Sequence, residues 1–410
     1  MTEGMEQVCS HDKPTEGRTM ANSRPKWILH GTRPHLPRYR GTHESTVSWL
    51  AAAHARSEAT LRQGDADFDA PAFRRQMERH IRRFGPSSQV MGWRLSDIGE
   101  FLDEDFSKKD LFPLHRLPQG APMGQRMDRF ADMALDAVRE LYPEDGSEPP
   151  DEWIHVTCTG YAAPSALQTL ANQRHWNERA RLIHLYHMGC YASLPALRVA
   201  AGLLAQDENT RSCDLVHTEI CTLHLNPSRH DPEQLVVQSL FADGYIRYSL
   251  SPARDFPAAS GGFYVLAFHE WLVADSLEDI GWLPGEFGMR MTLSRQVPDR
   301  IAAVLDGFMS ALASRAGLPK TEMEKAHYAI HPGGPRIVDK VAEWLDLEPR
   351  QVTATREVLF ERGNMSSATL PHIWHRMLET GGVGPGELVV SLAFGPGLTV
   401  YGSLMRRNEA

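Results

Sequence analysis

The chain has 410 residues, 42% of them hydrophobic and 23% charged, a balance typical of globular proteins with a substantial core. Its formal net charge of −9 argues against general nucleic-acid binding, which requires a basic face, and leaves room for a local basic patch. No apolar run approaches the roughly 18 residues that cross a bilayer, and residues 1–25 lack the apolar core of a signal peptide. We therefore expect a disordered tail over 1–25, followed by a cytoplasmic protein without a membrane span.

Cysteine usage supports a reducing compartment. The five cysteines are Cys9, Cys158, Cys190, Cys213 and Cys221. An odd number without a CxxC pair argues against a disulfide framework or a structural zinc site. The histidine pairs at 184/187 and 372/375 lack the carboxylate and spacing of a zinc protease motif. We predict no metal and no other cofactor.

In chain order, the region 28–150 carries amphipathic helices, including 71–84 and 124–141, and ends in a polar turn at 143–150. Short apolar or β-branched runs then predict buried strands at 153–157, 181–186, 214–218, 263–268, 327–330, 387–394 and 398–404. Helical patterns lie between them at 191–205, 298–313, 336–345, 349–361 and 366–379. This alternation predicts α/β layers with largely buried sheets.

Cys190 directly follows Gly189 and directly precedes a helical pattern. The sequence therefore places its sulfur at a helix N-terminus, where free N–H groups and the macrodipole favour thiolate. Glycine suits a tight turn with close backbone approach. A buried core cysteine is the alternative interpretation of the same pattern.

His331 ends the predicted strand 327–330 and precedes Pro-Gly-Gly, and Asn364 follows 33 residues later. With Cys190 they offer a thiol nucleophile, a histidine and an amide donor. Such a set can take an acyl group onto sulfur and stabilise charge on a thioester carbonyl. Papain-like hydrolases use the same three residue types, but they predict a secreted, disulfide-bonded precursor. A non-catalytic assembly partner is a third class, which the intact three residues disfavour.

Six motifs follow one another through the last half of the chain. They are Thr218-Glu-Ile-Cys, Ser239-Leu-Phe-Ala-Asp-Gly, His331-Pro-Gly-Gly-Pro, Thr355-Arg-Glu-Val-Leu, Gly363-Asn-Met-Ser-Ser-Ala and Phe394-Gly-Pro-Gly-Leu-Thr. In order and spacing they closely resemble type III polyketide synthases, the chalcone synthase-like group of the thiolase fold. The resemblance implies an α/β protein with a duplicated thiolase fold in αβαβα layers. The halves would be 26–255 and 256–410, dividing at a Pro- and Gly-rich loop.

The resemblance also implies roles for the three residues. Cys190 would carry the acyl starter, while His331 and Asn364 would bind the malonyl thioester carbonyl as carbon dioxide leaves. The resulting carbanion would attack the acyl group on Cys190. Substrates would be acyl-CoA and malonyl-CoA, or acyl carrier protein thioesters, and the family forms homodimers.

The chamber residues depart from the family pattern. Phe241 matches the first gatekeeper, but Met291 stands where the second is usually phenylalanine, which predicts a softer wall. Ala163 replaces a methionine that reaches across the dimer in plant relatives. The other predicted lining residues are Cys158, Thr159, Cys221 and Ser366. Small side chains here favour a long acyl starter, because each buried methylene contributes roughly 0.8 kcal/mol; packing drift is the alternative.

A basic cluster on the helix at 71–84 is the predicted docking site for CoA or a carrier protein. Its members are Arg74, Arg75, Arg79, Arg82 and Arg83, and a solvated arginine face is an equal alternative. The function predicted is a decarboxylative Claisen-condensing acyltransferase that releases a pyrone or resorcinol. A ketosynthase that joins two carrier-bound β-ketoacyl chains into an α-pyrone is the alternative within the class.

Overall fold

A computed structural model describes residues 25–143, 148–256, 261–334 and 336–408. The tail predicted over 1–25 therefore falls almost wholly outside the described residues. So do the middle of the polar turn at 143–150, most of the loop predicted to divide the halves, and Pro335 of the His331 motif.

One nine-stranded sheet, in the order β11-β12-β13-β8-β1-β7-β6-β4-β5, forms the centre of the molecule. The strands before the predicted division are β4 Glu152–Thr157, β5 Arg181–Tyr186, β6 Cys213–Ile220 and β7 Asp243–Pro252. Those after it are β8 Gly262–Leu272, β11 His327–Ile330, β12 Leu388–Gly395 and β13 Thr399–Arg407. Strand β1, Trp27–His35, pairs antiparallel with both β7 and β8 and so joins the two groups.

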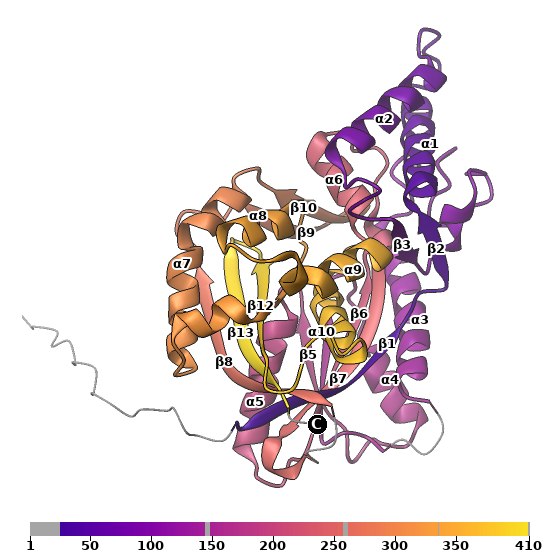
Figure 1. The fold of residues 1–410 in the computed structure, drawn as a ribbon. Helices are drawn as coiled ribbons and strands as arrows, with labels where there is room; N and C mark the ends of the chain where they lie inside the picture. Colours follow the sequence, from indigo (N-terminus) through magenta and orange to yellow (C-terminus); the bar gives the residue numbers. More distant parts are fainter. Residues whose placement is uncertain (1–24, 144–147, 257–260, 335, 409–410) are drawn as a thin grey trace, which may run out of the picture.

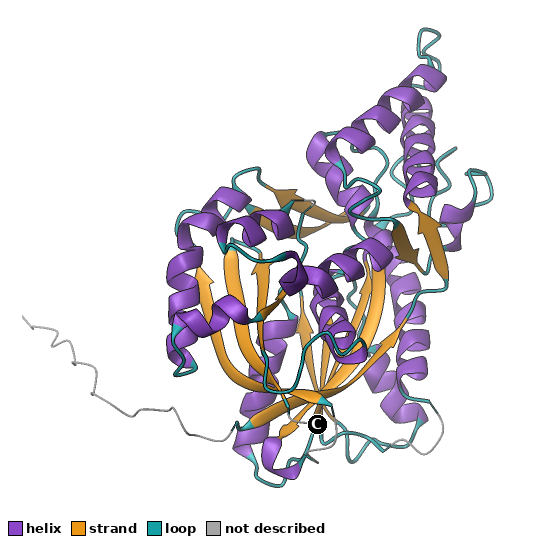
Figure 2. Ribbon diagram, viewed as in Figure 1, coloured by secondary structure: helices purple, strands orange, loops and turns teal. Residues whose placement is uncertain are grey.

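Helices cover the sheet in layers (Figures 1 and 2). The helices packed around this sheet are α3 Met123–Leu141, α4 Ala166–Gln173, α5 Ser193–Gln206, α7 Val297–Arg315, α8 Ile337–Trp344, α9 Thr353–Arg362 and α10 Thr369–Glu379. Helix α5 contacts β4, β6 and β13, and α10 contacts β7 and β11, so both lie between the two groups of strands. Helix α3 covers β6 and β7 from outside, and α7 covers β8 and β13. This confirms the αβαβα thiolase architecture.

Every predicted strand is present; β5 and β11 match their predicted ranges, and the ends of the others differ by a few residues. The helix predicted at 349–361 is instead a 3-10 turn, Pro349–Val352, followed by α9, and the one at 366–379 is a 3-10 turn, Ser366–Ala368, followed by α10. The sequence patterns missed two strands of the central sheet, β1 and β7, and the helix α4. They also missed α6 Pro232–Leu240 and the hairpin of β9 Ile280–Gly285 and β10 Gly288–Leu293. Within the described ranges, no helix is both long and apolar enough to span a bilayer.

An N-terminal extension stands beyond the sheet (Figure 1). It contains β2 Tyr39–Thr42, α1 His43–Leu61, α2 Ala70–Phe84 and β3 Trp93–Ser96. Helix α2 begins where the Asp69 carboxylate accepts a hydrogen bond from the Ala72 N–H, an N-cap that satisfies one free donor of the first turn.

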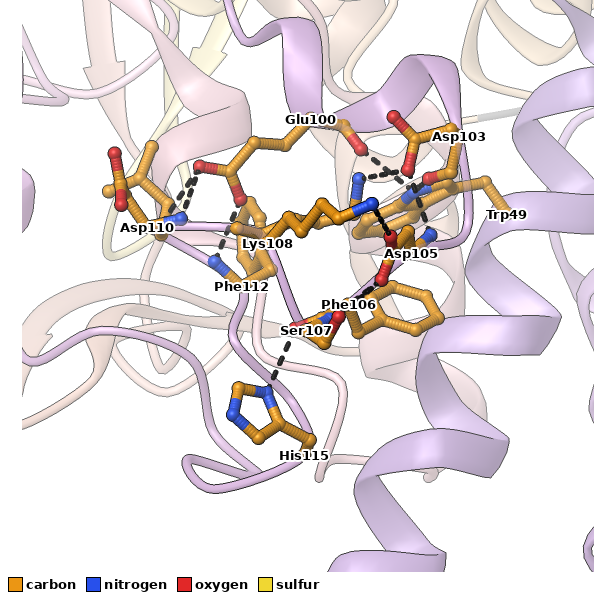
Figure 3. A network of polar contacts seen from close by, with 12 residues as sticks. Trp49, Glu100, Asp103, Asp105, Phe106, Ser107, Lys108, Asp110, Phe112 and His115 are labelled. Carbon is orange, nitrogen blue, oxygen red and sulfur yellow. Dashed lines mark hydrogen bonds and ion pairs between the residues drawn. The ribbon is translucent and has the colours of Figure 1, made fainter.

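The loop that returns from the extension to α3 is held by one carboxylate. Glu100 accepts hydrogen bonds from the backbone N–H groups of residues 110, 111 and 112 at 2.9–3.0 Å. The Trp49 indole of α1 donates to the carbonyls of Glu100 and Asp103, at 3.1 and 2.9 Å (Figure 3). These bonds fix α1, and α2 packed against it, relative to the sheet.

Candidate active site

Cys190 lies in the turn between β5 and α5. Gly189 before it has φ of +83°, and a Cβ there would lie 2.7 Å from Cδ of Pro396, so the turn requires glycine on two counts. The Cys158 side chain supports the same turn, because its sulfur accepts from the Gly189 N–H at 3.0 Å. Helix α5 begins at Ser193, two residues later than predicted, and Cys190 therefore precedes its first turn.

The pKa of the Cys190 thiol is shifted in the direction opposite to the sequence prediction. Burial raises its pKa to about 12, and a hydrogen bond with Ser366, at 3.7 Å between Sγ and Oγ, opposes that shift only partly. The buried carboxylate of Glu219 raises it further. This direction is opposite to the predicted thiolate, because removal of the sulfur from water disfavours its charged form.

His331 continues from the end of β11 and donates its backbone N–H to the carbonyl of Leu392 on β12, at 2.8 Å. Its side chain is fully buried, and burial lowers its pKa to about 3, so the imidazole is neutral at pH 7. Neither ring nitrogen has a hydrogen-bond partner in the described chain. A buried polar group without a partner is unfavourable unless a ligand satisfies it, and this ring borders Gly333, which lines the cavity.

Asn364 connects the histidine and cysteine segments. Its Nδ2 donates to the carbonyl of Pro332, next to His331, at 3.2 Å. Its Oδ1 accepts from the N–H of Ser366 at 2.9 Å, and Ser366 contacts Cys190. Since Oδ1 is held by an N–H donor, the amide presents its NH2 group toward the His331 segment. The structure thus brings the three predicted residues into one connected site.

Glu219 is a site residue that the sequence reasoning did not single out. It is fully buried on β6, and its carboxylate accepts from the Cys158 N–H at 3.1 Å, the Thr159 hydroxyl at 2.8 Å and the Ser367 hydroxyl. Burial raises its pKa. The available signal was a single acidic residue inside an otherwise uncharged motif, Thr218-Glu-Ile-Cys.

A cavity of about 800 Å³ opens beside Cys190. Of the predicted chamber residues, it is lined by Cys158, Thr159, Cys221, Phe241, Met291 and Ser366. Cys158 also lies in the core, as its apolar context indicated, with 2% of its surface exposed. The fully buried His331 and Asn364 lie behind this wall rather than on it.

Met291 lines the cavity, and an aromatic side chain that the sequence did not predict lies beside it. Met291 on β10 pairs directly with Trp282 on β9. The Trp282 ring stacks on Phe241 at 6.5 Å between centroids and 24° between planes, and its indole N–H donates to the Cys158 carbonyl at 2.6 Å. The aromatic bulk therefore comes from the neighbouring strand. Sequence reasoning missed it because the hairpin itself was not predicted.

Ala163 does not line the cavity of its own chain. It is exposed, after the exposed Tyr161 and near the end of β5, which is the last strand of the sheet. Ala163 is therefore not part of the cavity wall that this chain forms by itself.

The predicted docking arginines divide into three groups. Arg74 pairs with Glu104 at 2.7 Å, and Arg82 pairs with Glu44 and Glu78 at 2.7 and 2.9 Å. Arg75 and Arg79 are exposed on α2 away from the cavity lining. Of the predicted cluster, only Arg83 lines the cavity. Two arginines that the sequence did not predict, Arg295 and Arg336, also line it.

The described residues contain no group of three His, Cys, Asp or Glu side chains placed to hold a metal ion. The chemistry that the site supports uses its own thiol, imidazole and amide. A thiol at a tight turn, a neutral imidazole and an oriented NH2 group form the set that acyl transfer through sulfur requires.

Known proteins share both the sequence and the fold. Residues 128–247 match the chalcone and stilbene synthase N-terminal domain, and residues 271–408 match the C-terminal domain. Type III polyketide synthase C of Arabidopsis thaliana is 29% identical over 310 residues, which cover 72% of this chain and 80% of that protein.

Two solved structures illustrate the likeness in fold. The brown algal PKS-I of Ectocarpus siliculosus superposes with a TM-score of 0.78 at 19% identity, covering 94% of this chain and 99% of that one. The 1,3,6,8-tetrahydroxynaphthalene synthase of Streptomyces coelicolor gives 0.73 at 23% identity, covering 93% and 100%. The fold and site define a thiolase-type condensing enzyme. The two domain matches place the chain in the chalcone and stilbene synthase family, as a type III polyketide synthase.

Proposed function

We propose that this protein loads an acyl starter from a thioester onto Cys190, condenses it repeatedly with malonyl-derived units, and releases a pyrone or resorcinol. The observation that carries the proposal is the connection of Cys190, His331 and Asn364 through Ser366 and Pro332, next to a cavity that Cys190 and Ser366 line.

Loading begins from a neutral pair. Because the pKa of Cys190 is raised and that of His331 lowered, the resting site holds thiol and imidazole rather than an ion pair. His331 would take the thiol proton as sulfur attacks the thioester carbonyl, and the carrier thiol would leave with that proton. A thioester oxygen would also supply the partner that the buried ring lacks.

Condensation uses the other half of the site. As the malonyl carboxylate leaves as carbon dioxide, its electron pair moves to the thioester oxygen, and the His331 ring and the Asn364 NH2 group would donate to the enolate that forms. The enolate carbon then attacks the acyl carbonyl, and the bond to the Cys190 sulfur breaks. Asn364 suits this role because a neutral amide stabilises charge without protonating the carbon.

Arg83, Arg295 and Arg336 support delivery of the substrate on CoA or on a carrier protein. They surround the cavity that leads to Cys190, and a phosphate-bearing arm is their natural counterpart. This proposal replaces the earlier docking cluster on Arg74, Arg75, Arg79 and Arg82 with residues that reach the cavity.

A homodimer in a reducing, cytoplasmic compartment completes the proposal. Strand β5 is an edge strand with unpaired backbone groups on one side, a natural place for a second copy. Cys158, Cys190, Cys213 and Cys221 are all free thiols, which favours a reducing environment.

Intact-protein mass spectrometry tests the central claim. Wild-type protein incubated with an acyl-CoA should gain the mass of one acyl group, and Cys190→Ala should gain none while keeping its circular dichroism spectrum. An adduct of equal yield on the variant would refute the assignment. Activity with malonyl-CoA and one acyl-CoA, against dependence on two carrier-bound chains, separates polyketide extension from chain fusion.

A further inference from the structure

A second cavity, of about 190 Å³, lies directly behind the active-site wall. It shares Cys221, Phe241 and Trp282 with the main cavity, so these three side chains form the partition between the two spaces. Beyond the partition it extends to residues exposed on the surface, including Arg229, Glu286 and Arg290. It is therefore a side pocket next to the site of condensation.

The inner end of this side pocket contains a buried arginine. Arg94 on β3 is only 6% exposed, and its Nε donates to the carbonyl of Phe241 at 2.7 Å. Its Cζ lies 5.4 Å from the centroid of the Phe101 ring, which covers one face of the guanidinium. Burial lowers its pKa to about 10, so it remains charged at pH 7.

The charge of Arg94 is not neutralised by an ion pair. The charge of Asp243 acts on Arg94 and raises its pKa, but the two residues are not hydrogen-bonded. The Asp243 oxygens instead accept from the Ser96 hydroxyl, the Asp97 N–H and both donors of Thr222. In the part of the chain that the structure describes, no carboxylate forms an ion pair with Arg94. Buried charges in proteins are normally paired, so an anion in the side pocket would satisfy the free guanidinium N–H groups.

The other residues that line the side pocket also favour a negatively charged ligand. Arg229 and Arg290 add positive charge, and Glu286 is the one acidic residue among the described lining residues. Asp231 compensates Arg229 in part, at 3.4 Å. His224 adds no charge, because burial lowers its pKa to about 3, and its Nδ1 accepts from the Met289 N–H while Nε2 bonds to the Thr159 carbonyl.

We propose that the side pocket binds an oxyanion at the distal end of the chain carried on Cys190, with Arg94 as the residue that recognises it. The chemical class is an acyl thioester whose far end is a carboxylate, for which a guanidinium offers two parallel donors. The chain would reach the side pocket when the Trp282 ring moves off Phe241, because the two stacked rings form part of the partition. This inference rests on the proposed acyl loading and specifies its substrate.

A competition experiment tests the pocket. Nonanedioyl and nonanoyl thioesters of CoA, which differ only in the terminal carboxylate, are offered together, and acylation of Cys190 is followed by mass. In Arg94→Met the ratio of nonanedioyl to nonanoyl loading should fall about tenfold or more, the scale of one lost charge-assisted hydrogen bond. Arg94→Lys keeps the charge but loses the two parallel donors, so its loading ratio should lie between those of wild type and Arg94→Met. Arg56→Gln, an exposed arginine on α1, is the matched control and should leave the ratio unchanged.

The outcomes separate this inference from the proposed function. A merely structural Arg94 would slow both thioesters equally, and an unchanged ratio would overturn the proposal. If Arg94→Met does not fold, Arg290→Gln at the exposed end should lower the ratio in the same direction, and no change would overturn it. If no thioester loads wild-type protein, the proposed function fails. Calorimetry then decides the pocket, because free nonanedioate should bind Arg94→Lys more weakly than wild type, and equal binding would refute it.

Discussion

Phe241 and Asn364 lie on adjacent extended segments that form an isolated parallel bridge. The N–H of Asn364 donates to the carbonyl of Leu240 at 3.1 Å, and the N–H of Ala242 donates to the carbonyl of Asn364 at 2.8 Å. The cavity wall and the amide that orients toward His331 are therefore parts of one rigid unit. A substrate that displaces Phe241 also acts on Asn364.

Asn364→Ala should permit loading of Cys190 and impair condensation. The substitution removes the NH2 group proposed to stabilise the enolate, and loss of one such donor typically costs about 10²–10³ in rate. Loading is measured by intact mass and condensation by product formation from malonyl-CoA. Equal loss of both steps would contradict the division of labour.

Trp282→Ala should shift products toward longer or bulkier chains. The substitution removes the ring that stacks on Phe241 and that pairs with Met291 across the hairpin. The main cavity and the side pocket then become one space. Product chain length with a fixed starter, by mass spectrometry, is the readout. Leu283→Ala, one residue further on β9 and 53% exposed, is the control. An unchanged product pattern would show that Trp282 does not limit the chamber.

Gly189→Ala should destabilise the protein and abolish loading. The new Cβ meets Pro396, and a non-glycine residue at φ of +83° adds strain of about 1–3 kcal/mol. Gly202→Ala is the matched control, since its Cβ would meet nothing within 4 Å on the exposed side of α5. It should stabilise by roughly 0.5–1 kcal/mol. Urea unfolding measures both, and equal effects would contradict the requirement for glycine at the turn.

Alkylation of Cys190 should keep accelerating at alkaline pH. A pKa raised to about 12 leaves less thiolate at pH 7 than an ordinary cysteine has. Iodoacetamide labelling, located by peptide mapping, should be slower than that of a short cysteine peptide and should rise after the peptide reaches its plateau. A plateau for Cys190 below pH 8 would instead restore the thiolate that the sequence predicted.

Acid should destabilise the fold from pH 6.5 downward. Burial lowers the pKa to about 3 for His54, His155, His217, His224 and His331. Between these two pKa values the unfolded chain binds more protons than the folded one. The free energy of unfolding therefore decreases as the pH is lowered, by up to about 1.4 kcal/mol per pH unit for each histidine. Asp243, with a pKa raised to about 6, opposes this in part. Urea midpoints that stay constant from pH 7 to pH 5 would contradict the prediction.

The sequence predicted what local patterns encode. Strands such as β5 and β11 were located to the residue because apolar runs between turn signals mark buried strands, and Cys190, His331 and Asn364 were located by their motifs. It could not predict the pKa of Cys190, because burial of the thiol arises from segments far along the chain. Trp282 was missed for a related reason: its role follows from pairing with Met291, and a hairpin with half-exposed strands carries a weak pattern.

Strand β1 has a consequence for how the chain is made. Trp27 pairs with Pro252 on one side and Val265 on the other, so β1 is synthesised long before β7 and β8 and cannot complete its pairing until both have been made. Contacts this distant along the chain slow folding. Until β8 emerges, β1 presents an open edge even when it is paired with β7, and an open strand edge can pair with another chain. Expression at reduced temperature or with a chaperone in excess addresses that interval.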